Sequence, residues 1–197
     1  MDVLKVKING ASPLLQHNPR FANPLDPLGK EHKKLTGKRT KTEEDHLAIM
    51  KSEWIGGLYY NEVVGYHIPG DYIKATLLGA AKLKKKGMAF KRGVLILEEC
   101  LPLNFADNKL PPDSLYAHKA GAYIDYRNVV VGQQRIMRCR PRFSDWSVTV
   151  EVMFDESQVD RDEIILAFEN AGRFIGIGDY RPESGGVFGR FTCEVLQ

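Results

Sequence analysis

Apolar and polar residues alternate at the start of the chain. Leu4, Val6 and Ile8 fall on one side of an extended segment, and the two lysines between them fall on the other. A period of two residues is typical of a strand that buries one face. The pattern therefore predicts a half-buried strand that ends at Gly10.

Three later segments carry apolar residues at the spacing of a helix. Acidic residues three positions after Thr42 and Asp160 complete the sequence pattern of a capping box, which marks a helix start. Between these two helices, Asp71 is the predicted N-cap of another helix that Gly87 closes. The apolar stripes are Leu47, Met50 and Trp54, then Ile73, Leu77 and Ala80, and finally Ile164, Phe168, Ala171 and Ile175.

The remaining periodic segments predict strands. Residues 58–68 are typical of a hairpin, residues 93–97 of a buried strand, and residues 129–143 and 146–154 alternate between apolar and polar. Residues 191–195 alternate in the same way at the end of the chain. The side chains expected to face inward are Trp146, Val148, Val150, Val152 and Phe154, followed by Phe191, Cys193 and Val195.

Taken in order, the core elements are strand, helix, strand, strand, helix and strand. This is the split βαβ pattern, so we expect an α+β, ferredoxin-like fold with one antiparallel sheet and helices on one face. The chain has 197 residues, which suits a single domain over 1–197. Residues 11–60 and 100–127 are candidate inserted loops, and the four prolines between 11 and 41 predict a long loop there.

Charge is concentrated in a few segments although the net charge is only +3. Residues 30–41 hold six lysines and arginines against one Glu, residues 82–92 hold six without an acid, and residues 135–142 hold four. Such clusters suit a polyanionic partner.

The arginines of the third cluster favour contact with phosphates. Arg138, Arg140 and Arg142 share one side of the predicted strand, about 7 Å apart if the strand is regular, and Arg135 precedes them. A guanidinium pairs bidentately with phosphate and stacks on bases. The alternative is an exposed strand that arginine keeps soluble, although such a strand normally mixes charge signs.

The lysine clusters have structural alternatives too. A helix C-terminus favours one or two cations through its dipole, but the second cluster has six. The run at 30–41 fits binding and a solvated loop equally well. The members of the second cluster are Lys82, Lys84, Lys85, Lys86, Lys91 and Arg92.

A glycine-rich turn fills residues 176–190. Glycines let a backbone approach a ligand closely, and Tyr180, Arg181, Phe188 and Arg190 add stacking surfaces and charge. A dinucleotide fingerprint needs a strand before it and a helix after it, and here that order is reversed. The turn is therefore a further candidate for nucleic-acid contact.

A glycine-rich turn between the last helix and the last strand, together with the helix-opening segment IPGDYIKATLLGAA, resembles the RAMP superfamily of RNA-binding proteins in CRISPR effector complexes. The segments INGASPLLQHN and GDYRP also resemble a small protein family of tailed phages. The superfamily resemblance implies a single strand bound across the sheet, a protruding thumb from an inserted segment, and head-to-tail assembly. The chain is short for a backbone subunit, and Asp179 and Glu183 in the turn would repel phosphate.

The sequence therefore predicts a non-catalytic protein that binds single-stranded RNA or DNA, as a homo-oligomer along the strand or as a ribonucleoprotein subunit. Some RAMP subunits cleave RNA with a loop aspartate, so an endoribonuclease using Asp26, with His17 as acid or base, is the alternative that the resemblance implies. An inhibitor or assembly protein that mimics a RAMP subunit is the third hypothesis.

Other chemistry has little support in the sequence. The histidines form no metal-spaced pair, three widely spaced cysteines predict buried thiols, and no nucleotide-hydrolysis or acyl-transfer motif occurs. We expect no metal and no cofactor. Without an apolar run of membrane-spanning length or a signal peptide, we expect the cytoplasm of a bacterial host.

Overall fold

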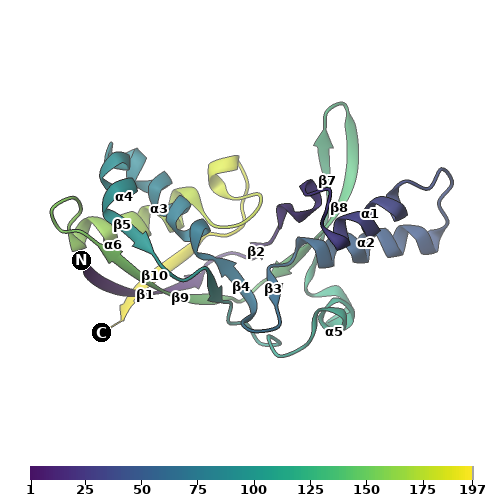
Figure 1. Cartoon of the computed structure of the whole chain (residues 1–197), viewed down its shortest axis with the longest axis horizontal. Helices are drawn as coiled ribbons and strands as arrows, with labels where there is room; N and C mark the ends of the chain where they lie inside the picture. The colour runs from purple at the N-terminus through teal and green to yellow at the C-terminus, as the bar shows by residue number, and fades with distance from the viewer. Residues whose placement is uncertain (197) are drawn as a thin grey trace. The chain divides into compact units, whose positions relative to one another are not determined.

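The computed structural model describes residues 1–196, apart from the side chains of Val131 and Gln134. It is an α+β structure with antiparallel sheets, divided into two compact units (Figure 1). Unit 1 comprises Met1–Leu14, Tyr60–Asn108 and Phe143–Gln197, and unit 2 comprises Leu15–Tyr59 and Lys109–Arg142.

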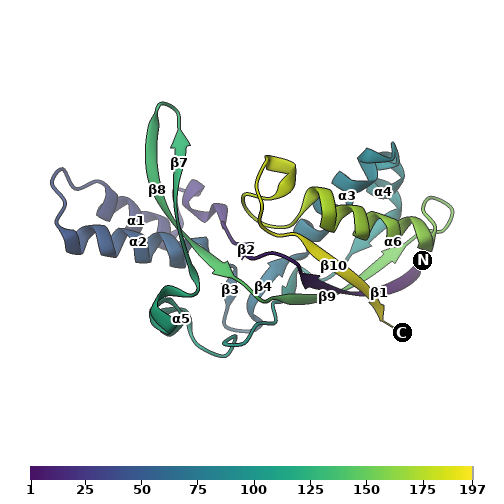
Figure 2. The same ribbon diagram turned by 180° about the vertical axis from the view of Figure 1, so that it is seen from behind.

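Unit 1 contains a four-stranded sheet of order β10-β1-β9-β5 and a small sheet of order β3-β4-β6. Helices α3 and α6 lie on one face of the larger sheet (Figures 1 and 2). The elements are β1 (Asp2–Gly10), β3 (Tyr60–Asn61), β4 (Gly65–Pro69), α3 (Gly70–Leu83), α4 (Gly87–Gly93), β5 (Val94–Ile96), β6 (Cys100–Pro102), β9 (Ser147–Phe154), α6 (Arg161–Asn170), a π-helical turn (Ala171–Ile175), a 3₁₀ turn (Pro182–Ser184) and β10 (Phe191–Leu196).

The core of unit 1 follows the predicted apolar pattern. The alternating residues of β1 and β9 that were expected to face inward are buried, as are the stripes of α3 and α6. At the start of α6, Asp160 and Glu163 form the predicted capping box, in which each side chain accepts from the other residue's backbone N–H. The first strand, the last helix and the strand 146–154 are therefore confirmed.

The prediction for the ends of α3 was wrong. Pro69 occupies the cap position, and Asp71 lies in the first turn, where its charge favours the positive end of the helix dipole. The helix ends at Leu83, because Lys85 adopts a left-handed conformation with φ of 59°. Gly87 opens α4 instead of closing α3.

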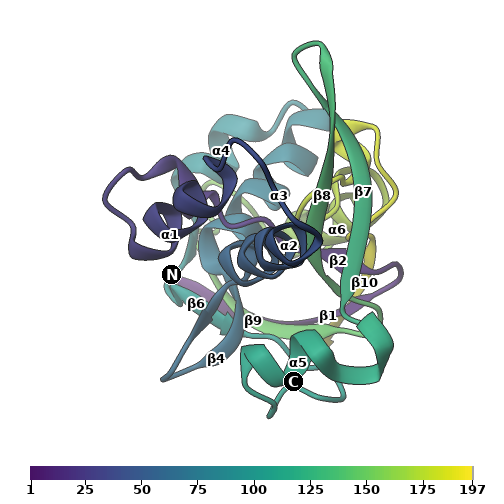
Figure 3. The same ribbon diagram turned by 90° about the vertical axis from the view of Figure 1, so that its right-hand side faces the viewer.

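Unit 2 combines a pair of helices with a three-stranded sheet of order β2-β8-β7. Figure 3 looks nearly along α2, with α1 on one side of it and the β7–β8 hairpin on the other. The elements are β2 (Leu14–Leu15), a 3₁₀ turn (Pro19–Ala22), α1 (Pro27–Thr36), α2 (Glu43–Gly57), α5 (Pro112–Ala117), a second 3₁₀ turn (His118–Gly121), β7 (Ile124–Val131) and β8 (Gln134–Phe143).

Helix α1 corrects the predicted long loop at 11–41. Asp26 is its N-cap and accepts a hydrogen bond from the Gly29 backbone N–H at 2.9 Å, and Pro27 takes the first helical position, where its missing N–H costs nothing. The proline that argued against a helix thus begins one. Helix α2 starts at the predicted capping box of Thr42 and Asp45.

The prediction of one strand over 129–143 was also wrong. Residues 124–143 form the β7–β8 hairpin, in which Val131 pairs with Gln134 and leaves a two-residue turn at Gly132-Gln133. Gly132 has φ of 62°. Asn-Gly and Asp-Gly are the pairs that usually signal such a turn, so a Gly-Gln turn gives a weak signal. The hairpin belongs to the sheet of unit 2 and not to the sheet that contains β9.

Candidate nucleic-acid interface

The two units carry opposite net charges. Unit 2 has 15 lysines and arginines against 8 acidic residues, a net charge of +7, whereas unit 1 has 13 against 17, a net charge of −4. The two values add to the +3 of the whole chain. A polyanion is therefore attracted to unit 2 and repelled, on average, by unit 1.

The open face of the large sheet in unit 1 does not carry the predicted basic side chains. Lys5 forms a salt bridge with Glu151 at 2.9 Å, and Lys7 lies opposite Glu194 in the register of β1 and β10. The charges on this face are balanced. The expectation that arginines line this sheet is corrected, because the predicted arginine row lies on β8 in unit 2.

The arginine row on β8 is partly engaged within unit 2. The Nη1 of Arg138 donates to Oε1 of Glu53 on α2 at 2.7 Å, and the other Glu53 oxygen accepts from the backbone N–H of Cys139 at 3.0 Å. The Glu53 side chain is only 9% exposed. Arg138 therefore neutralises a buried carboxylate, and its first role is structural.

Acidic side chains also lie near the arginine that follows Arg138 on the same side of β8. Arg140 lies opposite Asp125 in the β7–β8 register, and Asp125 holds Arg127 in a salt bridge at 3.0 Å. Arg140 and Arg142 are both half-buried. This side of the hairpin combines cations with carboxylates, so it is less basic than the sequence of β8 alone indicates.

Burial also affects the thiol beside this ion pair. Burial raises the pKa of Cys139 to about 12, and the nearby carboxylates of Glu53 and Asp125 add to the effect. A thiol with that pKa is protonated and unreactive in the folded protein. Alkylation of Cys139 therefore reports the opening of unit 2.

The opposite side of the hairpin is open to solvent. Tyr126 is 50% exposed, Val130 69% and Met137 50%, and Arg135 is exposed beside them. Cross-strand register places Arg135 opposite Val130 and Met137 opposite Asn128. We call these residues the exposed hairpin face: Tyr126, Asn128, Val130, Arg135 and Met137.

Sequence reasoning missed most of the exposed hairpin face. Only Arg135 was predicted, because the argument followed the arginines and took residues 129–143 as one strand. The turn at Gly132 is the signal that was available, since it places Tyr126 and Val130 on the same side as Arg135. An aromatic ring on the same face of a hairpin as an arginine suits base stacking combined with phosphate contact.

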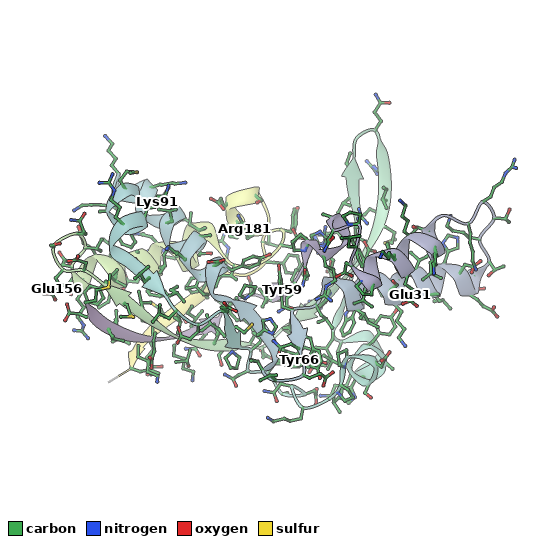
Figure 4. All side chains as sticks on the ribbon, viewed as in Figure 1. Glu31, Tyr59, Tyr66, Lys91, Glu156 and Arg181 are labelled. Atoms are coloured by element: carbon green, nitrogen blue, oxygen red, sulfur yellow. The ribbon has the colours of Figure 1, made fainter. Side chains whose placement is uncertain are left out.

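The second lysine cluster lies on unit 1, around the end of α3 and along α4. Lys82, Lys84, Lys85, Lys91 and Arg92 are exposed. Lys86 is exposed too, but it forms a salt bridge with Glu163 at 2.6 Å, and hydrogen bonding to that carboxylate raises the pKa of Lys86. Figure 4 labels Lys91 on this part of unit 1. The cluster is a local basic patch on an acidic unit.

The side chains of the glycine-rich turn are held mostly by the turn itself. Arg181 forms a salt bridge with Glu183 at 2.6 Å and donates to the Gly178 carbonyl at 3.2 Å. The rings of Tyr180 and Phe188 lie 6.2 Å apart. Arg190 donates to the Arg173 carbonyl. Figure 4 labels Arg181 on this turn.

Two glycines of the turn are required by close contacts within its own backbone. A Cβ at Gly186 would lie 1.7 Å from the Tyr180 carbonyl oxygen, and one at Gly189 would lie 1.7 Å from that of Ile177. The Gly189 carbonyl also accepts from the Ile177 N–H at 2.9 Å. These two glycines let the loop close on its own backbone, which accounts for them without a ligand.

The predicted residues therefore form three groups on two units. Unit 2 holds the four arginines of β8, and unit 1 holds the lysine cluster and the glycine-rich turn. Of the two candidate catalytic residues, Asp26 caps α1 and His17 is exposed. Within residues 1–196, no three His, Cys, Asp or Glu side chains gather so as to hold a metal ion.

No protein-family model matches the chain, and no curated protein matches its sequence. Among the helices that the structure describes, none is long and apolar enough to cross a membrane.

Proposed function

We propose that this chain is a non-catalytic protein that binds single-stranded RNA or DNA, and that unit 2 carries the main binding surface. The observation that supports it best is the charge of +7 on unit 2 beside −4 on unit 1. Neutralising phosphates supplies most of the sequence-independent affinity for a nucleic acid. Unit 2 is the part of the chain with the charge to do this.

The exposed hairpin face supports a preference for unpaired bases. Tyr126 offers a flat ring, Arg135 a guanidinium that stacks and pairs with phosphate, and Met137 an adaptable apolar surface. Bases inside a duplex cannot reach such a surface, whereas bases of a single strand can. The lysine cluster and the glycine-rich turn of unit 1 remain candidate contacts of secondary importance.

Within this proposal, unit 1 is a ferredoxin-like domain of the RAMP type. Its main strands follow the chain order β1, β5, β9, β10, with α3 before β5 and α6 before β10, which is the split βαβ pattern. Unit 2 then corresponds to inserted segments, and the β7–β8 hairpin to a thumb. The same resemblance leads us to propose assembly along the strand, within a ribonucleoprotein of a bacterial host.

The ultraviolet absorbance spectrum of the purified chain tests the proposal. We expect co-purifying nucleic acid to move the absorbance maximum from that of protein toward that of nucleic acid, and a single-strand-specific nuclease to restore it. Parallel digestion with ribonuclease and deoxyribonuclease identifies the nucleic acid. A protein spectrum, together with no binding to single-stranded oligonucleotides at low salt, would contradict the proposal. Co-purification of another protein alone would favour the assembly or inhibitor hypothesis.

A further inference from the structure

Helix α1 presents a lysine surface that is separate from the exposed hairpin face. Leu28, His32 and Leu35 are half-buried. The His32 ring stacks on Phe21 with centroids 4.4 Å apart, and its Nδ1 lies 3.2 Å from the Ser52 hydroxyl of α2. These contacts fix the side of α1 that meets α2.

The opposite side of α1 is mainly cationic, with the exposed Glu31 at its edge. Lys30, Lys33 and Lys34 are exposed and fall within about 100° of one another around a helix of 3.6 residues per turn. Arg39 is exposed in the connection to α2. Within residues 1–196, no acidic side chain forms an ion pair with any of these four. We call Lys30, Lys33 and Lys34 the α1 lysine face.

Structural roles account for only part of this charge. The helix dipole favours Lys33 and Lys34 in the last turn of α1. Other cations of the segment have partners: Lys38 pairs with Asp45 at 2.5 Å, and Lys41 donates to the Lys38 carbonyl at 2.8 Å. The α1 lysine face has no such partner in the described chain, although acids begin α2 nearby.

The chemistry of this surface differs from that of the exposed hairpin face. No Phe, Tyr or Trp occurs between residues 22 and 53, so the α1 lysine face has no aromatic ring for stacking on bases. A lysine ammonium is a compact charge on a flexible stem, which binds phosphate without fixed geometry. Such a surface reads the backbone and not the bases.

We propose that the α1 lysine face is a second phosphate-binding surface that accepts single and double strands alike, whereas the preference for single strands belongs to the exposed hairpin face. This inference rests on the proposed function of unit 2. Since α1 and the hairpin lie on different sides of α2, each surface can be altered alone (Figure 3). Altering the α1 lysine face should then lower the affinity for single strands and duplexes alike, whereas altering the exposed hairpin face should lower the affinity for single strands.

The experiment measures the affinity of the full chain for a fluorescent single-stranded oligonucleotide and for its duplex across a range of salt concentrations. In the variant K30Q/K33Q/K34Q, three lost phosphate contacts reduce the slope of log affinity against log salt by about 2 for the single strand and somewhat more for the duplex. Affinity falls for both forms, and the ratio between them changes little. The variant K5Q/K7Q/K74Q removes the same charge from unit 1 and is expected to leave both slopes unchanged.

The outcomes separate this inference from the proposed function. If the unaltered chain binds neither form, the proposed function fails and this inference fails with it. If the chain binds but K30Q/K33Q/K34Q keeps both salt slopes, only this inference is overturned. Loss of single-strand affinity with unchanged duplex affinity, or no duplex binding by the unaltered chain, also overturns it. Circular dichroism of the variants checks that α1 remains folded.

Discussion

Replacing Arg138 with alanine is expected to lower the free energy of unfolding by about 3 kcal/mol. The change leaves the Glu53 carboxylate, 9% exposed, without the guanidinium that pairs with it at 2.7 Å. Removing one partner of a buried ion pair typically costs about 3–5 kcal/mol. We take the lower end, because the Arg138 side chain keeps 32% exposure and water can screen the pair.

Two variants control this prediction. Arg135 lies three residues away on the same strand, but it is exposed and has no acidic partner among the described residues, so Arg135→Ala should change stability by less than about 0.5 kcal/mol. The double variant Glu53→Gln with Arg138→Met removes both charges and should recover much of the loss. Denaturation followed by circular dichroism gives the stability, and Cys139 alkylation reports on unit 2. Equal stability of the Arg138→Ala and Arg135→Ala variants would show that the pair is not structural.

The Arg138–Glu53 pair limits which substitutions can test the role of the β8 arginines in nucleic-acid binding. Reversing Arg138 and Arg140 to glutamate would place two further acids beside Glu53 and Asp125. Lost binding would then reflect an unfolded unit 2. Arg135, on the exposed side, is the arginine of β8 whose charge can be removed with the least effect on folding.

Replacing Tyr126 with alanine is expected to weaken binding to single-stranded nucleic acid by about 10- to 100-fold. Stacking of one base on an aromatic side chain is worth about 1–3 kcal/mol, and about 1.4 kcal/mol corresponds to tenfold in affinity. The Tyr126 residue is 50% exposed, so a base can approach its side chain without rearrangement of unit 2. Duplex affinity should change little, because paired bases do not reach the ring.

Phenylalanine at the same position separates the ring from the hydroxyl. Tyr126 also forms a side-chain hydrogen bond with Tyr116, which contributes, after burial, to a raised pKa of Tyr116. Tyr126→Phe loses that bond and keeps the stacking surface, so single-strand affinity should stay close to that of the unaltered chain. Fluorescence anisotropy with a labelled oligonucleotide measures all three proteins. If Tyr126→Phe binds as weakly as Tyr126→Ala, the hydroxyl and not stacking matters, and unchanged binding in both removes Tyr126 from the interface.

The elements that the sequence predicted well depend on neighbouring residues. The capping boxes at Thr42 and Asp160 define helix starts through bonds between residues three apart, and the alternation in β1 and β9 reflects one buried face. Helix α1 could have been found by the same reasoning, since Asp26-Pro27 is a good start signal.

The arrangement of the candidate site depends on distant residues, and the sequence gives little access to it. Arg138 meets Glu53 across 85 positions, and no local pattern indicates that pairing. The assignment of β8 to a sheet separate from β9 likewise depends on pairing with β7 across a turn that has a weak signal. For this reason the sequence predicted a row of arginines that faces a nucleic acid, whereas the structure places the carboxylates of Glu53 and Asp125 beside those arginines.

Ultraviolet cross-linking of the full chain to a single-stranded oligonucleotide, followed by mass spectrometry of the linked peptides, tests the central claim most directly. The account predicts cross-links in residues 15–59 and 109–142, with Tyr126 and Met137 among the linked positions. Cross-links confined to residues 1–14, 60–108 and 143–196 would place the nucleic acid on the acidic unit and contradict it.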